Sequence, residues 1–212
     1  MVDNVILVDN VKRREIMSKE FCVKNMHKFD PKKIEMLLSE DRKKEIDPMK
    51  YLKGKGLKEG MVFADIGCGP GFFVFPASEI VSKNGKVYAV DTQQEMLDEL
   101  KKRKPAKNVI ILKSGESKMS VDSAIVDIAI MVFVLHEVYK PIEFLKEVKR
   151  VLKLSGKLIA IDWEKRVEEK GPPFEERLPR EKTEELFHKT RFKKIEVSSL
   201  NPSHYEIMGC RE

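Results

Sequence analysis

The chain has 212 residues, of which 42% are hydrophobic and 36% are charged, enough to bury one full core but not to require a second domain. Lys and Arg number 41 and Asp and Glu number 35, but the two signs are interleaved along the chain. This pattern is typical of a solvated surface and makes a nucleic-acid-binding face unlikely, although it does not exclude one. The longest apolar run, Ile128 to Leu135, is far shorter than the roughly 20 residues needed to cross a membrane.

The cysteines and the amino terminus indicate the compartment. Cys22, Cys68 and Cys210 are odd in number and widely spaced, which fits a reducing cytoplasm better than a disulfide framework. No CxxC pair suggests a metal site. The segment Met1 to Asp9 carries two acids and lacks the basic start of a signal peptide. We therefore expect a cytoplasmic protein without a metal.

Residues 1–48 are rich in lysine and are broken by Pro31 and Pro48. Their short apolar stretches predict a helical cap, and residues 49–212 then form a ligand-binding domain. A short helix is predicted from Pro48 to Leu57, leading into the first strand. We assign the domain boundary to the step between residues 48 and 49.

The stretch from Val62 to Phe73 predicts a strand, a glycine turn and the start of a helix. Its apolar run is typical of a strand that is covered on both faces. Gly67, Gly69 and Gly71 permit a tight turn and remove the Cβ atoms that would keep a ligand away from the backbone. A turn without a ligand would show the same glycine pattern, so the neighbouring residues decide.

The next strand, Lys86 to Asp91, ends on an acid about 20 residues after Gly71. Doubly wound nucleotide-binding folds use an acid at this position to accept hydrogen bonds from ribose hydroxyls. The alternative role of Asp91 is to cap the following helix. Together with the glycine turn, Asp91 favours the ribose role.

The sequence Asp65-Ile66-Gly67-Cys68-Gly69-Pro70-Gly71 narrows the choice of ligand. NAD-binding folds usually carry an apolar residue in place of Asp65 and continue to Gly-x-Gly-x-x-Gly, whereas residues 72 and 74 here are Phe and Val. The stretch resembles the first motif of the class I S-adenosylmethionine-dependent methyltransferases, Asp-Ile-Gly-Cys-Gly-x-Gly. The segment from His27 to Pro31 also resembles the opening of small prokaryotic members of the UbiE-like group.

The resemblance implies S-adenosylmethionine as cofactor and S-adenosylhomocysteine as product. It implies a doubly wound, Rossmann-like α/β fold with seven strands, helices on both faces and a C-terminal antiparallel hairpin. The turn Ser114 to Ser117 resembles the Gly-Asp-Ala turn that holds the adenine ring, with Glu116 where the family usually has Asp. The cofactor-binding residues implied are Asp65, Gly67, Cys68, Gly69, Gly71, Asp91, Thr92, Glu116, Ser117 and Phe133.

The remaining elements follow from hydrophobic periodicity. The predicted helices are Phe72 to Val81, Gln93 to Arg103, Pro141 to Leu152 and Glu181 to Lys189. The predicted strands are Asn108 to Lys113, Ile125 to Leu135, Lys157 to Trp163, Phe192 to Val197 and His204 to Cys210. The last two strands are expected to be joined by Ser198 to Ser203 and to form the closing hairpin.

The end of the strand at Ile125 to Leu135 faces the methyl acceptor in the family. Enzymes that methylate base amino groups carry Asn/Asp-Pro-Pro-Tyr/Phe there, and this chain does not. Its apolar residues favour a small, partly hydrophobic acceptor. His136 and His27 are candidate catalytic bases, because a neutral imidazole accepts a proton at physiological pH. Capping or surface roles for both histidines remain open.

Residues 164–180 contain charges, one glycine and three prolines, and they follow the strand that ends at Trp163. We expect a substrate-shaping loop or lid anchored by Trp163 and Phe174, with a disordered linker as the alternative. The competing functions are an RNA or protein methyltransferase, an NAD-dependent oxidoreductase, and a cofactor-binding protein without turnover. The acceptor and the oligomeric state do not follow from the sequence.

Overall fold

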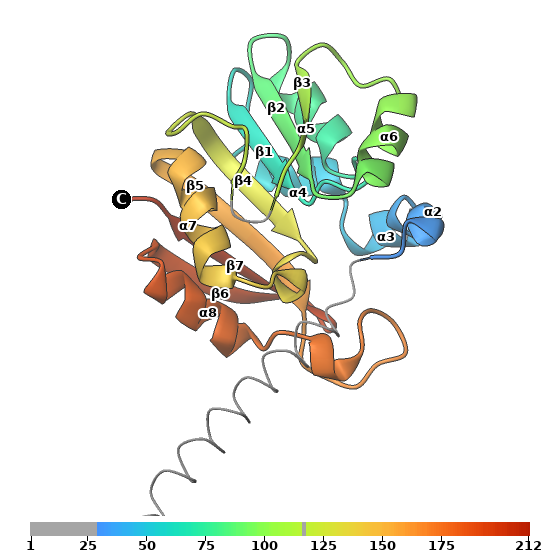
Figure 1. The fold of residues 1–212 in the computed structure, drawn as a ribbon, viewed down its shortest axis with the longest axis vertical. Coiled ribbons are helices and arrows are strands. Elements are labelled where there is room, and N and C mark those ends of the chain that lie inside the picture. The colour runs from blue at the N-terminus through green and yellow to red at the C-terminus, as the bar shows by residue number, and fades with distance from the viewer. Residues whose placement is uncertain (1–28, 116–117) are drawn as a thin grey trace, which may run out of the picture.

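The computed structural model describes residues 29–115 and 118–212, and the chain forms one seven-stranded sheet with helices on both faces (Figure 1). The strand order is β3-β2-β1-β4-β5-β7-β6. The strands are β1 (Val62–Ile66), β2 (Lys86–Asp91), β3 (Val109–Lys113), β4 (Val126–Val132), β5 (Leu152–Trp163), β6 (Lys193–Asn201) and β7 (His204–Cys210).

Strands β1 to β5 run parallel, and β7 pairs antiparallel with both β5 and β6. The chain winds outward from β1 to β3 and then returns to place β4 on the other side of β1. In open α/β sheets, ligands bind beyond the carboxyl ends of the strands at this switch point. The glycine turn after β1 lies there, and the predicted fold class, including the C-terminal hairpin, is confirmed.

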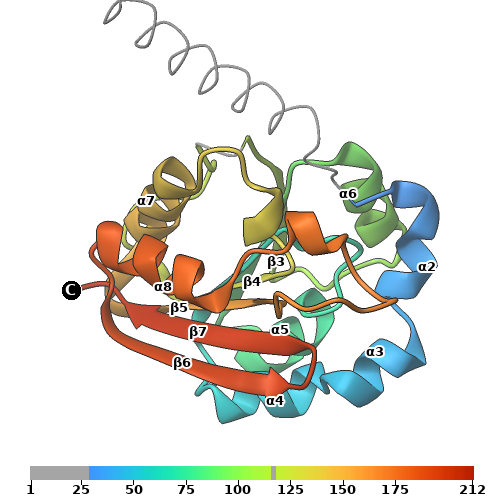
Figure 2. The same cartoon turned by 90° about the horizontal axis from the view of Figure 1, so that it is seen from below.

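Two hydrophobic clusters cover the two faces of the sheet. One face carries α4 (Pro48–Gly54), α5 (Val74–Val81) and α6 (Gln94–Lys102), and the other carries α7 (Pro141–Val151) and α8 (Arg180–Lys189). Figure 2 shows α7 and α8 on the side of the sheet opposite α4 and α5. The side chains of β4 alternate between the clusters, with Ala129 and Met131 in one and Ile128 and Ile130 in the other. This alternation explains why β4 reads as a continuous apolar run.

Local sequence signals set most helix boundaries. Pro141 is the first residue of α7, where the missing N–H of proline costs no intrahelical hydrogen bond. The helix after the glycine turn begins at Val74 rather than at Phe72. Pro76 therefore lies in the first turn of α5, where proline is tolerated.

Two connections differ from the sequence-based prediction. The strand predicted to begin at Lys157 begins five residues earlier, because β5 starts at Leu152 and pairs with β4 through a register shift. The loop expected from Ser198 to Ser203 is mostly strand, because β6 continues to Asn201 and only Pro202 and Ser203 separate it from β7. The start of β5 pairs with β4 at Leu152 and Val126, and the end of β6 pairs with β7 at Asn201 and His204. This long-range pairing overrides the weak local strand signals.

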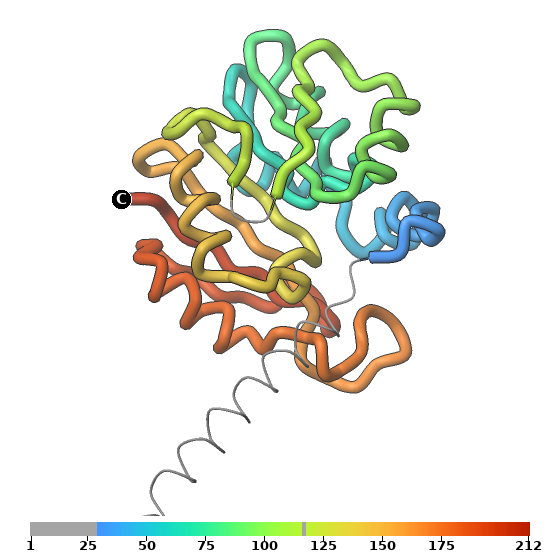
Figure 3. Tube along the Cα trace, viewed as in Figure 1, coloured from blue at the N-terminus to red at the C-terminus, as the bar shows by residue number. Residues whose placement is uncertain are grey.

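The short helices η1 (Pro31–Lys33), α2 (Ile34–Leu37) and α3 (Glu40–Glu45) lie beyond the carboxyl ends of the strands, on the same side as residues 164–180 (Figures 1 and 3). An ion pair of 3.7 Å joins Lys170 to Glu45 across these two segments. Helix α4 is attached to the hairpin, because Tyr51 and Lys55 both donate to the buried carboxylate of Glu206. The domain boundary after residue 48 stays a prediction.

Candidate active site

The glycine turn has the left-handed backbone that its sequence predicts. Gly67, Gly69 and Gly71 have φ angles of 73°, 53° and 95°. A Cβ on Gly71 would lie 2.5 Å from the side chain of Leu100, and one on Gly67 would overlap Val134. A Cβ on Gly69 would meet only Leu37, at 3.6 Å. Gly67 and Gly71 are therefore required by internal packing, whereas Gly69 presents bare backbone towards the cap.

Asp91 holds the turn from the end of β2. Its Oδ2 accepts a hydrogen bond from the Gly69 N–H at 2.8 Å, and its Oδ1 accepts one from the Gln93 N–H at 2.9 Å. The second bond closes a turn just before α6 and is not a helix cap, because the N-cap residue of α6 is Gln93 and it has no side-chain capping bond. Each carboxylate oxygen can accept more than one hydrogen bond, so a ribose hydroxyl remains compatible with both. Thr92 follows it and is half-buried.

Asp65 and Cys68 lie at the base of the turn. Asp65 is 3% exposed, and burial raises its pKa to about 7 against the opposing effect of the Arg42 charge. The Cys68 thiol contacts the Gly69 carbonyl, and burial, with the Asp65 and Asp91 charges, raises its pKa well above the ordinary value. The thiol is therefore not an activated nucleophile.

Three aromatic rings gather where β4, β5 and β7 meet. The centroid of the Phe133 ring lies 5.0 Å from that of Trp163 and 4.8 Å from that of His204, and the centroids of Trp163 and His204 are 4.3 Å apart. We call these three residues the aromatic cluster. Phe133 has a φ of 61°, which costs a non-glycine residue free energy and is enriched at functional sites. Phe133 and Trp163 are half-buried, so part of each ring is accessible.

His136 forms a dyad with the buried Asp162 at the end of β5. The His136 Nδ1 lies 2.7 Å from Asp162 Oδ1, and the His136 backbone N–H donates to Oδ2 at 3.3 Å. Burial lowers the pKa of His136, but the Asp162 charge and this hydrogen bond outweigh it and raise the pKa above the ordinary value. An imidazole that donates Nδ1–H to a carboxylate keeps a lone pair on Nε2 and can act as a base.

Glu137 adds a second titratable group to this end of the sheet. Its Oε1 lies 3.9 Å from His136 Nε2, and burial raises its pKa to about 7. The His136 charge and a hydrogen bond from the Phe29 backbone oppose this rise. Two titratable groups, each with a raised pKa, therefore lie side by side at this end of the sheet.

His204 carries its ring proton on the other nitrogen from His136. Asn201 Oδ1 accepts hydrogen bonds from the backbone N–H groups of Ser203 and His204, which turns its amide nitrogen towards His204 Nδ1 at 3.0 Å. Nδ1 is thus an acceptor, and Nε2 carries the proton. Burial lowers the pKa of His204 to about 4, so the ring stays neutral and offers an N–H donor at physiological pH.

The segment after β5, residues 164–180, is organised around the buried Arg177. Its guanidinium lies 5.1 Å from the Trp163 ring and forms an ion pair of 2.8 Å with Glu168. It also donates to the backbone carbonyls of Glu164, Lys170 and Pro172. These contacts hold the segment together beside Trp163. Its role as a substrate-shaping loop or lid stays a prediction. Phe174 is 40% exposed and is not the second anchor that we expected.

Several predicted site residues lie together, and others lie outside the described residues. Asp65, Cys68, the glycines, Asp91 and Thr92 surround the turn, while Phe133 and His136 lie at the end of β4. His27, Glu116 and Ser117 are outside the described part of the chain, so their proposed roles stay predictions.

Four residues of the site were not identified from the sequence: Arg42, Asp162, Arg177 and His204. The stretch Asn201 to Tyr205, which contains His204, resembles the Asn-Pro-Pro-Tyr motif only superficially and comes too late in the chain to serve as that motif. A usable signal was present, because the closing hairpin must pair with β5. That pairing sets His204 opposite Trp163.

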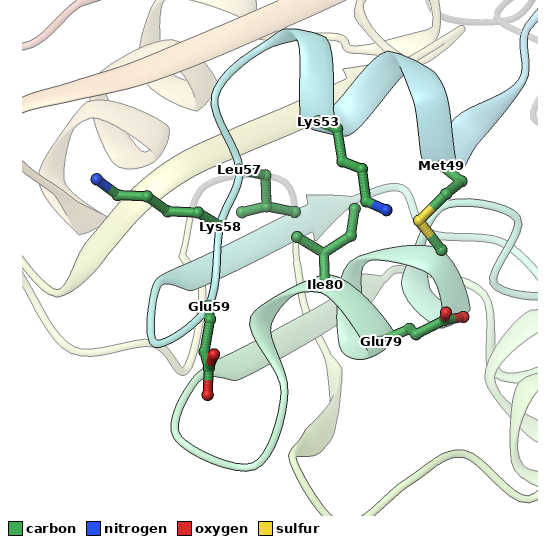
Figure 4. A pocket seen from close by; sticks show the side chains of 7 residues that line it. All are labelled: Met49, Lys53, Leu57, Lys58, Glu59, Glu79 and Ile80. Carbon is green, nitrogen blue, oxygen red and sulfur yellow. The ribbon is translucent and has the colours of Figure 1, made fainter.

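One surface hollow lies away from this site. It has a volume of about 350 Å³ and lies between α4, the end of α5 and the loop before β1 (Figure 4). Met49, Lys53, Leu57, Lys58, Glu59, Glu79 and Ile80 line it. Its loop residues, Leu57 to Glu59, lead into the amino end of β1, at the opposite end of this strand from the glycine turn. The hollow is therefore not part of the site.

Metal-binding and membrane-spanning features were also sought. Across residues 29–115 and 118–212, no group of three or more His, Cys, Asp or Glu side chains is arranged to hold a metal ion. Within the same ranges, no helix has the length and apolar character required to cross a bilayer.

The strand order and the glycine turn define a Rossmann-like nucleotide-binding fold of the methyltransferase type. A family description, "Methyltransferase domain", matches residues 64–160. The crystal structure of a SAM-dependent methyltransferase from Aquifex aeolicus has a TM-score of 0.82 and 36% identity, covering 87% of this chain and 100% of that one. A putative type 11 methyltransferase from Sulfolobus solfataricus gives a TM-score of 0.66 at 27% identity, covering 78% and 92% of the two chains.

The chain therefore belongs to the S-adenosylmethionine-dependent methyltransferases, as the sequence motif indicated, and its class of cofactor is S-adenosylmethionine. The demethylmenaquinone methyltransferase of Lactococcus lactis is 29% identical over 116 residues, which cover 53% of this chain and 46% of that protein. The chain spans less than half the length of the curated relatives that it matches.

Proposed function

We propose that this chain transfers the methyl group of S-adenosylmethionine to a small, partly hydrophobic acceptor at the carboxyl ends of β4 and β5. The observation that carries the proposal is the His136–Asp162 dyad at the end of the strand that also carries Phe133. When bound, the cofactor supplies a methyl group activated by a sulfonium, and the protein must align the acceptor and exclude water.

The glycine turn supports binding of this cofactor. The open side of Gly69 lets a ligand approach the backbone, and Asp91 ends the neighbouring strand at the position suited to ribose hydroxyls. Within this proposal, Asp65 faces the amino-acid tail. Thr92 and Phe133 flank the cofactor, and Glu116 and Ser117 contact the adenine edge.

The acceptor is defined by two imidazoles of opposite polarity and two half-buried rings. His136 offers a lone pair on Nε2, which takes the proton that the acceptor atom loses as it bonds to the methyl carbon. His204 offers an N–H donor beside Phe133 and Trp163. This set suits a small molecule with a planar apolar part and an ionisable hydroxyl group. A relative named demethylmenaquinone methyltransferase supports a small-molecule acceptor.

The experiment measures S-adenosylhomocysteine formation with hydroxylated naphthalenes and phenols, small amines, total RNA and unfolded protein as acceptors. We expect turnover with the hydroxylated aromatic compounds. His136→Asn should lower kcat by about 10²- to 10⁴-fold, the usual contribution of a general base, without changing affinity for S-adenosylhomocysteine. His188→Asn, at an exposed histidine of α8, is the matched control and should leave kcat unchanged.

The pH profile gives an independent check. A pKa of His136 above the ordinary value of about 6.5 means that the base form is lost as the pH falls through that pKa, so turnover should rise as the pH is raised above about 6.5. Methylation of RNA or protein alone would contradict the proposal. So would a His136→Asn variant with wild-type kcat.

A further inference from the structure

Two buried side-chain nitrogens have no hydrogen-bond partner in the described part of the chain, Arg42 Nε and His204 Nε2. Both residues flank the same ring, because the Arg42 Cζ lies 5.5 Å and the His204 ring lies 4.8 Å from the centroid of Phe133. Buried donors are almost always paired, and each unpaired one costs about 1–3 kcal/mol. Two unpaired donors beside one ring indicate that acceptor atoms of a ligand belong there.

Arg42 extends from α3 of the cap towards the site. Its guanidinium lies 4.5 Å from the centroid of the Phe72 ring and donates to the Leu37 carbonyl at 3.0 Å. It forms no ion pair with a carboxylate of residues 29–115 or 118–212. Burial lowers its pKa to about 10, although the Asp65 and Glu45 charges act in the opposite direction. Arg42 as a whole is half-buried, but its Nε is fully buried and has no hydrogen-bond partner among the described residues. A cation that is partly removed from water and has no anion beside it is costly, so the position calls for a bound anion.

Asp65 is the complement of Arg42. It is buried at the end of β1, and its carboxylate has no hydrogen bond or ion pair among the described residues. Arg42 and Asp65 interact electrostatically but do not touch closely enough to form an ion pair. The site therefore holds one cation and one anion that both lack a close ionic partner. The amino-acid tail of S-adenosylmethionine carries one carboxylate and one ammonium, which matches both.

We infer that Arg42 binds the carboxylate of the cofactor's amino-acid tail, opposite an ammonium that lies at Asp65. The cap reaches the turn in this arrangement, because Leu37 is the residue nearest to the open side of Gly69. Cofactor binding then fastens α3 onto the glycine turn. The inference rests on the proposed function only for the identity of the cofactor.

Calorimetry with two ligands measures how much the amino-acid tail of the cofactor contributes to binding. S-adenosylhomocysteine carries the amino-acid tail, whereas 5′-methylthioadenosine keeps the adenine, ribose and sulfur but lacks it. Arg42→Met should weaken S-adenosylhomocysteine binding by about 10- to 100-fold, the scale of a charge-assisted hydrogen bond, and change 5′-methylthioadenosine binding by less than about twofold. Lys43→Met, on the exposed side of the same helix, should change neither. Arg42→Lys should restore part of the selectivity.

Equal weakening of both ligands would show that Arg42 only supports the shape of the site, and unchanged binding would show that it is not a ligand; either result overturns the inference. If the wild-type chain binds neither ligand, the cofactor assignment itself fails.

Amide hydrogen exchange supplies a second readout. S-adenosylhomocysteine should slow exchange across residues 40–45 in the wild type, and neither 5′-methylthioadenosine nor the Arg42→Met variant should show this protection. Protection by both ligands would contradict the inference. This readout needs no acceptor.

Discussion

The cofactor side of the site is built from backbone, whereas the acceptor side is built from side chains that come from distant parts of the chain. Around the glycine turn, the important groups are three glycines with left-handed backbone and the two backbone N–H groups that donate hydrogen bonds to Asp91. Around the aromatic cluster, Phe133, Trp163 and His204 belong to β4, β5 and β7 or their ends, and Arg177 of residues 164–180 lies over the Trp163 ring.

The glycine turn is constrained by its backbone geometry, whereas the acceptor side sets the specificity for the methyl acceptor. A backbone turn tolerates few side chains, because each Cβ meets either the core or the ligand. An acceptor site made of side chains on separate strands can change by single substitutions while the sheet stays intact. The predictions below test the two sides separately.

The largest expected effect distinguishes two glycines of the turn. Gly71→Ala should lower the free energy of unfolding by about 3 kcal/mol, because its Cβ would overlap Leu100 and its φ is 95°. Gly69→Ala should cost only about 1 kcal/mol, since its φ of 53° is accessible to alanine and its Cβ meets nothing closer than 3.6 Å.

Urea unfolding measures these stabilities, and calorimetry measures the affinity for S-adenosylhomocysteine. Gly69→Ala should weaken that affinity at least about tenfold, because its methyl group would occupy the space through which the ligand reaches the backbone. Equal losses of stability in the two variants would contradict the division of roles between Gly69 and Gly71.

The second effect concerns the acceptor side. Arg177→Met should lower the free energy of unfolding by about 2–3 kcal/mol, because it removes a buried ion pair with Glu168 and leaves backbone carbonyls without a donor. Limited proteolysis should then cut within residues 164–180, while affinity for S-adenosylhomocysteine stays within about twofold. Arg166→Met, at a more exposed arginine that also pairs with Glu168, is the control. A large loss of cofactor affinity in Arg177→Met would show that the two sides are not independent.

The smallest effect is a pH dependence on the cofactor side. Asp65 has a pKa of about 7, so its carboxylate is lost as the pH falls from 8 to 6, and with it the attraction for the ammonium of the tail. Affinity for S-adenosylhomocysteine should therefore fall about tenfold over this range, and affinity for 5′-methylthioadenosine should stay constant. Calorimetry at several pH values checks this. The same slope in Asp65→Asn would assign the dependence to another group.

The sequence was sufficient to predict the glycine turn and the strands on either side of it, because the signals for them are local. Asp65, the three glycines and Asp91 occur within 27 residues, and strand, turn and helix follow one another without interruption. β2 begins and ends where the hydrophobic pattern placed it, at Lys86 and Asp91. Local pattern, backbone conformation and packing agree in this region, and such agreement makes a fold predictable.

The acceptor side could not be predicted in the same way. His204 and Trp163 are 41 positions apart and meet only because β7 pairs with β5 in one register. Arg177 lies in a segment whose prolines and charges are equally typical of a disordered linker, and its burial depends on carbonyl groups that no pattern marks. Such contacts depend on register and on backbone hydrogen bonds, which a single sequence does not encode in its periodicity.

A crystal structure of the chain with S-adenosylhomocysteine tests the account most directly. We predict that the ligand lies over the bare backbone of Gly69, with its ribose hydroxyls within hydrogen-bond distance of Asp91 and its tail between Asp65 and Arg42. The sulfur should face Phe133 and His136 at the end of β4. A ligand bound away from Gly69, or with its sulfur directed away from β4, would contradict the assignment of this site.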